Sequence, residues 1–519
     1  MADPLASAVR FLRGGGALVA ALLAITVWCP ASFAQRAEAP VGSSPPGPIQ
    51  TDTTGCAALV AAHPGAPCSF DFTQFRTNDA NLDILAAKGI VGSGLFRGNV
   101  YVARNAEEAN NLGKRLKPGD QLVLQNGDWR NAALSIEAKG TPSQPILIRG
   151  ESESGVTLTG TSSVRLWGEN LILRDLKFAD GTADKDPYVV VRFGAGANQA
   201  CNRCIVDHIE VDSFKSAPDR YSTLVVIYLL LQGRDITVAN STFSHKMNVG
   251  PVVFASHPIE HQCKVGMAPG EKCYQRLLMT NNRFSDVSKD VRQRRSPRGK
   301  FKIMEIGAGH FATASSFSVI QNNVFEYADG GTNTVDFKTS DVMVRRNRFY
   351  SNLGTLNLRS TNRVLIENNV FDGSERKGMG GVLIQGKGHW IAHNLFRNLT
   401  NPINDYHYPI SMSAGLYEEL ADGQTDYARS KQIVIADNVF EHVGFPPIAM
   451  GVFPKPEVGR TLMPTDVLYA NNVMSFAPGP SPPASPKLPA DPSFEDAIRY
   501  VEPRSGYTGI RFQDNRVVP

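Results

Sequence analysis

The chain has 519 residues, of which 42% are hydrophobic and 20% charged, with 46 glycines and 33 prolines. This composition fits a turn-rich, strand-rich globular protein, and no segment beyond the N-terminus is apolar enough to cross a membrane. The formal net charge is only +4, so bulk charge does not select a class of partner and charge has to be considered locally.

The first 34 residues are predicted to be a signal peptide. Arg10 and Arg13 give a basic start, an apolar run follows over about 17–27, and small residues end the segment at Ala34. The apolar run is too short for a comfortable membrane span. We therefore expect cleavage after Ala34 and a periplasmic or secreted protein.

Residues 35–100 are predicted to be an N-terminal leader and a pre-helix segment, and 35–54 are rich in Pro, Ser, Gly and Thr. From Asn105 an amphipathic pattern predicts a helix that ends at a Lys-Pro-Gly turn over 117–119 and leads into the first strand. Such a helix suits the cap of a solenoid, the architecture that the repeats described below indicate.

The cysteines indicate disulfide bonds. Cys29 is lost with the signal peptide, and an even number of cysteines in an exported chain favours disulfides. The alternative is a zinc or redox site at 201–204, but no histidine lies at a matching spacing and no thioredoxin-like context surrounds it. We expect three bonds between neighbours in sequence: Cys56 with Cys68, Cys201 with Cys204, and Cys263 with Cys273.

A repeat consisting of an apolar run, Asn, one or two residues and Phe extends from the middle of the chain to its end. Phe325, Phe349, Phe371 and Phe396 are separated by 24, 22 and 25 residues, and the larger separations elsewhere are near twice this unit. One unit of short alternating strands cannot bury its own apolar face, so the units must stack through parallel strands.

The two columns of the repeat have physical interpretations. Asn tolerates the left-handed conformation at a corner, and stacked Asn side chains can hydrogen-bond along the stack. The Phe column would fill the interior. The sequence therefore predicts an all-β fold, a single-stranded parallel β-helix over residues 101–476, followed by a Pro-rich loop and terminal strands over 477–519.

Two consecutive predicted strands, "TNTVDFKTSDV" and "GTLNLRSTNRV", each carry one outward cation, Lys338 and Arg359. Aligning their inward residues gives an offset of 21 residues, which is one unit, so that Lys338 stacks on Arg359. Asp336 then stacks on Asn357, and Glu305 of the preceding unit falls in register with Asp336.

Adjacent like charges destabilise a sheet, and two interpretations of this pair remain open. In the first, Asp336 and Glu305 neutralise the cations on a solvated face. In the second, the cations face a groove that binds an anion. A neighbouring arginine favours the neutral, basic form of a lysine, whereas Asp336 favours its charged form.

The segment "DGGTNTVDFKTSDVMVRRNRFYSNLGTLNLRSTNRVLIENNVFDG", followed by "GMGGVLIQGKGHWIAHNLFRNL", resembles polysaccharide lyase family 6, the chondroitinase B and alginate lyase group. The resemblance continues upstream through "GDWRNAALSIEAKGTPSQPILIRGESESGVTLTG", and the spacing from Lys to Arg is its most specific part. It implies a right-handed parallel β-helix that cleaves a uronate polymer by β-elimination, with Lys338 as the Brønsted base and Arg359 as the acid.

The resemblance also implies Ca²⁺, held by two glutamates seven and five residues before the lysine and by an asparagine. Those two positions are Gly331 and Asn333 here, so both carboxylates are missing and we expect no family-type Ca²⁺ site. Three possibilities remain open. Arg or Lys side chains neutralise the substrate, or Glu305, Asn333 and Asp336 form a different site, or the activity is altered or lost.

Further departures from the family and further candidate residues affect substrate binding. The histidine that follows the family's arginine is Ser360 here, and the arginine of its "GGxR" motif is Leu383. The basic stretch over 289–302 is either a solvated loop or an arm that steers a polyanion. Tyr406 and His407 lie in a loop that either binds sugar or packs internally. Three other histidines are expected in the structural ladder or at the edge of the groove: His310, His389 and His393.

We therefore expect an exported lyase for an acidic polysaccharide, with alginate as the first choice of substrate and a dermatan- or chondroitin-type chain as the second. We expect no metal or other cofactor, no nucleic-acid partner and a monomer. The alternatives are a non-catalytic carbohydrate-binding β-helix and a glycoside hydrolase, which would need paired carboxylates across a groove. The catalytic residues are predicted to be Lys338 and Arg359, and the substrate-binding residues Glu305, Asn333, Asp336, Asn357, Tyr406 and His407.

Overall fold

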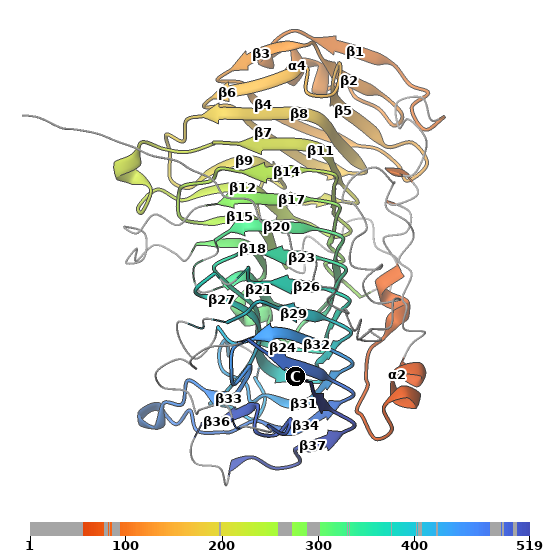
Figure 1. Cartoon of the computed structure of the whole chain (residues 1–519). Helices are drawn as coiled ribbons and strands as arrows, with labels where there is room; N and C mark the ends of the chain where they lie inside the picture. The colour runs from red at the N-terminus through yellow and green to blue at the C-terminus, as the bar shows by residue number, and fades with distance from the viewer. Residues whose placement is uncertain are drawn as a thin grey trace, which may run out of the picture. The chain divides into compact units, whose positions relative to one another are not determined.

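From residue 100 onward the chain winds into coils of short strands, and each strand pairs in parallel with its counterpart in the next coil (Figure 1). Stacking the coils produces three long parallel sheets, here named A, B and C, which enclose an apolar core. The predicted right-handed parallel β-helix is confirmed. The computed structural model describes residues 56–76, 81, 84–85, 94–196, 199–257, 272–287, 301–329, 331, 333–374, 376–400, 402, 407–421, 424–477, 489, 492–501 and 506–518.

The strands alternate around the coil in the order A, B, C, and β8 and β11 bend from sheet B into sheet C. Sheet A comprises β4 (Ala133–Lys139), β7 (Ser163–Glu169), β9 (Tyr188–Phe193), β10 (Cys201–Asn202), β12 (Val226–Gln232), β15 (Pro251–Ser256), β18 (Lys302–Gly307), β21 (Asn333–Lys338), β24 (Gly354–Asn362), β27 (Met379–Lys387), β30 (Ile410–Ser413), β33 (Ile448–Val452) and β36 (Ile498–Tyr500).

Sheet B comprises β1 (Val100–Ala103), β2 (Gln121–Leu124), β5 (Ile146–Gly150), β8 (Leu171–Gly181), β11 (Ile205–Asp212), β13 (Thr237–Ala239), β16 (Leu278–Thr280), β19 (Ser315–Gln321), β22 (Ser340–Arg345), β25 (Val364–Glu367), β28 (Trp390–Ala392), β31 (Lys431–Ala436), β34 (Thr465–Ala470) and β37 (Arg511–Gln513). Sheet C comprises β3 (Gly127–Arg130), β6 (Val156–Gly160), β14 (Thr242–Ser244), β17 (Arg283–Val287), β20 (Val324–Ala328), β23 (Arg348–Tyr350), β26 (Val370–Asp372), β29 (Leu395–Arg397), β32 (Val439–Val443), β35 (Val473–Phe476) and β38 (Arg516–Val517). The helical elements are α2 (Cys56–Ala62), η1 (Phe72–Arg76), α4 (Ala106–Gly113), η3 (Pro218–Arg220), η5 (Gly309–Phe311) and η6 (Pro456–Val458).

An asparagine ladder runs along the turns between sheets B and C, as predicted. The Asn347 side-chain amide donates to Oδ1 of Asn369 at 3.0 Å, and Asn369 donates in the same way to Asn394 at 3.0 Å. The left-handed conformation, however, belongs to the preceding residue, such as Asn368 with φ 55°. The prediction that one asparagine both adopts the left-handed conformation and forms the ladder is wrong. The corner needs a positive φ at one residue, and the next residue must direct its side-chain amide along the stack. The ladder consists of Asn282, Asn323, Asn347, Asn369, Asn394, Asn438, Asn472 and Asn515.

The phenylalanine column fills the interior beside sheet C. The rings of Phe349 and Phe371 lie 4.8 Å apart with an interplanar angle of 3°, and Phe371 stacks on Phe396 at 4.9 Å. Each ring is almost fully buried. Stacked rings fix the register of neighbouring coils, since a slip by one residue would turn the side chains to the outer face.

Helix α4 closes the N-terminal end of the β-helix (Figure 1). The Asn105 side chain caps it by accepting a hydrogen bond from the amide of Glu108 at 2.9 Å. The helix ends at Gly113, earlier than the predicted turn over 117–119, and strand β1 precedes it. The sequence therefore predicted the cap but missed the strand before it.

A segment named here the strap, comprising the described residues of 56–96, lies along the outer face of sheet B. It runs opposite to the direction in which the coils accumulate (Figure 1). Trp390 Nε1 donates to the Pro67 carbonyl at 2.8 Å, and Phe75 packs edge-on against Phe317 at 5.4 Å. Nearer the N-terminal coils, the Asn81 amide donates to Thr237 Oγ1 at 2.9 Å. The strap therefore covers an apolar strip on the outer face of sheet B, whereas the Pro- and Ser-rich residues 35–54 lie outside the described residues.

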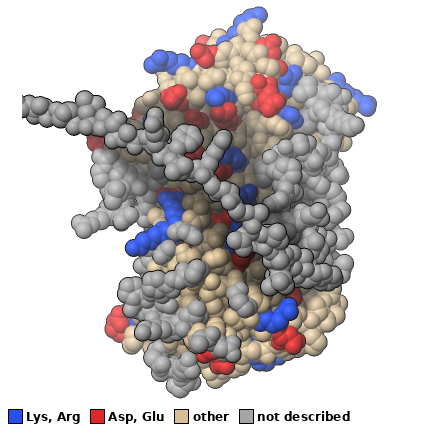
Figure 2. All heavy atoms as spheres, in the orientation of Figure 1, with Lys and Arg blue, Asp and Glu red and all other residues tan. Residues whose placement is uncertain are grey.

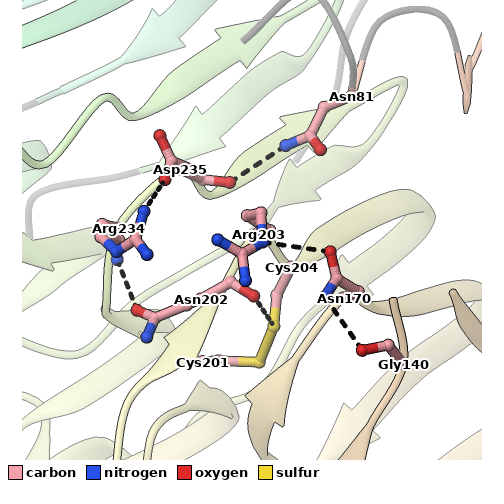
Figure 3. The surroundings of a disulfide bond; sticks show 9 residues. All are labelled: Asn81, Gly140, Asn170, Cys201, Asn202, Arg203, Cys204, Arg234 and Asp235. Carbon is pink, nitrogen blue, oxygen red and sulfur yellow. Dashed lines mark hydrogen bonds and ion pairs between the residues drawn. A yellow bond between two sulfur atoms is a disulfide. The ribbon is translucent and has the colours of Figure 1, made fainter. Parts of the chain in front are cut away.

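Two of the predicted disulfides are present, Cys56–Cys68 in the strap and Cys201–Cys204 at the sheet A to sheet B corner. Figure 3 shows the second bond under a polar network in which the Asn81 amide donates to the Asp235 carbonyl at 3.0 Å. Cys273 is also disulfide-bonded, and its predicted partner Cys263 lies outside the described residues. No helix among the described residues is long and apolar enough to span a bilayer.

Candidate active site

The candidate site lies on the outer face of sheet A, where β18, β21 and β24 run side by side. Glu305 pairs with Asp336 and Asp336 with Asn357 in the parallel register, as predicted from the offset between the two strands. Because Val335 and Phe337 point into the core, the alternate residues of β21 point outward. The register that places Lys338 and Arg359 on neighbouring strands is therefore confirmed.

Lys338 lies at the end of β21 with its side chain 14% exposed. Its ammonium donates to Glu305 Oε1, and Oδ2 of Asp336 lies 4.0 Å away. These contacts hold the lysine side chain against the two carboxylates. A lysine that acts as a base must give up this proton before it can accept one from a substrate.

Lys302 is a second ammonium in the same cluster. The sequence predicted no site role for it beyond its place at the end of the basic stretch over 289–302. It donates to Glu305 Oε2 at 2.8 Å and also to Asp336 Oδ2. Its side chain is only 6% exposed and that of Asp336 is fully buried. The signal available in the sequence was its position three residues before Glu305, although strand register was needed to bring it to Asp336.

The electrostatics of the cluster favour the charged forms of Lys302 and Glu305. Burial alone would lower the pKa of Lys302, but the charges of Asp336 and Glu305 outweigh it and raise that pKa. Burial would raise the pKa of Glu305, but Lys302 and Lys338 outweigh it and lower that pKa. The cluster is thus a set of alternating charges rather than a pair of repelling cations.

Asn357 connects the cluster to the neighbouring strand. Its amide nitrogen donates to Asp336 Oδ1 at 2.8 Å. Its Oδ1 is buried and accepts no hydrogen bond from the residues that the structure describes. A buried acceptor without a donor is costly.

Arg359 is held by Asp426, which sequence reasoning missed. The guanidinium Nε donates to Asp426 Oδ1 at 2.6 Å, and the arginine side chain is 30% exposed. Burial would lower the pKa of Arg359, but Asp336 and Asp426 outweigh it and raise that pKa. Asp426 belongs to the long connection between β30 and β31, in which Thr425 packs against Gly309 of η5. No local pattern marks Asp426, because its loop reaches the site from a later coil.

The residues present do not fit a family-type Ca²⁺ site. Gly331 offers no side chain, and the Asn333 side chain is buried beside Thr355. The nearest carboxylates, Glu305 and Asp336, already bind two ammonium groups. The described residues contain no group of three His, Cys, Asp or Glu side chains suited to a metal. Calcium requires several oxygen ligands, which this donor set does not supply.

The other predicted residues fall in different places. Tyr406 lies outside the described residues, and so does most of the basic stretch over 289–302. His407 is buried. Its role in substrate binding stays a prediction. His310 is exposed on η5 and contacts the ring of Phe311. His389 is fully buried inside the β-helix, and its Nδ1 accepts from the amide of Val364 at 3.1 Å.

The two departures from the family motif have structural counterparts. Ser360 is buried and accepts a hydrogen bond from the Ala428 amide at 3.2 Å, which ties the strand to the loop that carries Asp426. Leu383 pairs with Asn357 and packs under Tyr408 and Ala449. An apolar cluster therefore covers sheet A at the position where the family has an arginine. Figure 2 shows both basic and acidic side chains on the face in view.

Comparisons with known proteins identify the family and agree with the fold. The family model described as chondroitinase B matches residues 102–479. A mannuronic acid-specific polysaccharide family 6 lyase from the human gut microbiota superposes with a TM-score of 0.64 at 19% identity, covering 81% of this chain and 92% of that one. The lyase Pedsa3628 from Pseudopedobacter saltans gives 0.63 at 20% identity, with 81% and 92% covered.

A further structure, the alginate lyase AlyGC, gives a TM-score of 0.66 at 23% identity and covers 80% of this chain and 51% of that one. No curated protein matches the sequence. At these identities the structural likeness shows the fold, and the match of the family model over most of the chain shows the family. With its parallel β-helix and its Lys338–Arg359 pair in register on sheet A, the chain belongs to the chondroitinase B family, polysaccharide lyase family 6.

Proposed function

We propose that the protein cleaves a 1,4-linked uronate polysaccharide by β-elimination at the outer face of sheet A. The observation that carries the proposal is the pair Lys338 and Arg359, partly exposed on neighbouring strands and each oriented by a carboxylate, Glu305 or Asp426. Ion pairs between partly exposed side chains are weak, so a substrate carboxylate can compete for these two cations.

The reaction follows from the residue types. Lys338 in its neutral form takes the C5 proton of the uronate, and the electron pair forms the C4–C5 double bond as the C4–O4 bond breaks. The Arg359 guanidinium donates a proton to the departing O4. The negative charge that develops beside the substrate carboxylate requires nearby cations. Asn357 Oδ1, which is buried without a donor among the described residues, would accept from a sugar hydroxyl.

We propose alginate as the substrate. Two of the similar structures are described as acting on it or on its mannuronic acid units, and a dermatan- or chondroitin-type chain is the second candidate. The disulfides support an oxidising compartment, consistent with the signal peptide expected over residues 1–34.

A non-catalytic carbohydrate-binding β-helix is the alternative. It is favoured by one observation, that Lys338 contacts Glu305 and lies near Asp336 in its resting state. Such a protein would bind alginate without changing it.

The deciding experiment follows the ultraviolet absorbance of unsaturated uronate during incubation with alginate or dermatan sulfate. We expect absorbance to rise with the wild-type protein, with or without a chelator, and to stay flat with Lys338→Ala. Lys177→Ala is the matched control, because Lys177 also pairs with a glutamate, Glu210, but lies on the early strand β8. Binding without new absorbance in the wild type would support the non-catalytic alternative, and loss of activity on chelation would contradict the metal argument.

A further inference from the structure

The Lys302 ammonium occupies an unusual position for a surface lysine. It lies between the carboxylates of Glu305 and Asp336, with its side chain 6% exposed. Burying an ion pair costs about as much in desolvation as it returns in attraction, so stability alone is a weak reason for this arrangement. A positive charge fixed in this position is better explained by a function at the candidate site than by a contribution to stability.

Strand register identifies the place that Lys302 takes. Glu305 pairs with Asp336, and Lys302 and Asn333 each lie three residues earlier on the same two strands. Lys302 and Asn333 therefore occupy corresponding positions in the sequences of β18 and β21, and Asn333 is one of the two positions where the family resemblance implies a calcium-binding glutamate. The glutamates are absent, and an ammonium is present on the adjoining strand.

We propose that the Lys302 ammonium is the built-in cation of this site, which supplies at the substrate carboxylate the positive charge that Ca²⁺ supplies in the family. The inference rests on the proposed function and adds a residue to it. Of the three N–H donors of an ammonium, two are used by Glu305 and Asp336 within the described residues, and the third remains for a uronate oxygen.

The surrounding charges support this assignment. The charges of Asp336 and Glu305 raise the pKa of Lys302, which favours its charged form. Without Lys302, Glu305 and Asp336 would meet an incoming carboxylate with two negative charges, opposed by Lys338 and, more distantly, by Arg359. One lysine would then be a fixed cation and the other the base.

The test uses binding, so that it does not depend on turnover. In a Lys338→Ala background, calorimetry compares a mannuronate tetrasaccharide with its methyl ester, before and after Lys302→Met. We expect Lys302→Met to raise the Kd for the free acid at least about tenfold and that for the ester less than about twofold, because only the acid carries the charge that the ammonium meets. Lys302→Arg should retain binding of the acid.

Equal weakening for acid and ester would show a purely structural role and overturn the inference, as would unchanged binding of the acid by a Lys302→Met protein. Thermal melting of each variant checks that it is folded. A wild-type protein that shows this difference in binding but never forms unsaturated uronate would contradict the proposed function and leave the role of Lys302 standing. If neither ligand binds the Lys338→Ala protein, both the inference and the proposed substrate class fail.

Discussion

Arg359 shows how a single residue of the site depends on a distant part of the chain. Its guanidinium is oriented by Asp426, which comes from a loop between later strands of the coil stack. An acid that must protonate O4 has to be held in one direction, and a carboxylate hydrogen-bonded to Nε provides that direction. Asp426 is therefore a positioning residue.

We expect Asp426→Ala to lower kcat by about ten- to a hundredfold while changing KM less, because the guanidinium loses its orientation rather than its charge. Steady-state kinetics on the cleaved polymer measure this. Glu418→Ala is the control, since Glu418 lies in the same loop but pairs with Arg429 and Lys431. An equal loss in both variants would indicate general loosening of the loop.

His389 makes the fold sensitive to acid. Burial lowers its pKa from 6.5 to about 3, so between these pH values the unfolded chain binds a proton that the folded chain does not. Stability present above pH 6.5 is therefore lost as the pH falls toward 3. His389→Asn keeps an acceptor near the Val364 amide, and we expect it to reduce the loss of unfolding free energy between pH 7 and 4.5 by about 2–3 kcal/mol. Denaturant titrations at the two pH values measure this loss of unfolding free energy. An equal loss in the variant and the wild type would contradict the prediction.

Among the elements, the asparagine ladder contributes stability that is local to each corner. Asn369 accepts from the amide of Asn347 at 2.9 Å and from its side chain at 3.0 Å, and it donates to the carbonyl of Val344. Removing it strands several buried polar groups at once.

We predict that Asn369→Ala lowers the free energy of unfolding by about 2–4 kcal/mol, since at least two buried groups lose their partner. The control is Asn515→Ala at the last step of the ladder, which has a neighbour on one side only and should cost less. Chemical denaturation of the two variants makes the comparison, and a larger cost at Asn515 would show that the ladder is not the source of stability.

Elements with a local pattern were predictable from the sequence, and those that depend on contacts between distant segments were not. The Asn and Phe columns repeat within each coil, so their spacing revealed the β-helix. The alternation of inward residues in two consecutive strands then gave the register of Lys338 with Arg359. The left-handed corner was misplaced by one residue, because Asn368 and Asn369 look alike in sequence. Asp426 and Lys302 join the site through the loop path and the strand register, which no short motif encodes.

For the whole molecule, the strap determines what the outer face of sheet B exposes. Leu59, Phe70 and Phe75 cover Met343, Leu365 and other apolar residues that would otherwise face water. An uncovered strip of this kind is an aggregation site.

Phe75→Ala should loosen the strap and cost about 3–5 kcal/mol where it packs on Phe317. The measurement is limited proteolysis, with cleavage expected to accelerate within residues 56–96 while the coils stay intact. Phe72→Ala serves for comparison, because Phe72 is only partly buried. Equal cleavage rates in the wild type and Phe75→Ala would mean that the strap is held elsewhere.

The direction of the strap also bears on biogenesis. Leu59 is synthesised before Val434 and Leu468, the residues of later coils with which it packs. This part of the strap therefore stays undocked until those coils have been synthesised and folded. In the meantime its apolar side chains are exposed and offer a binding site for chaperones.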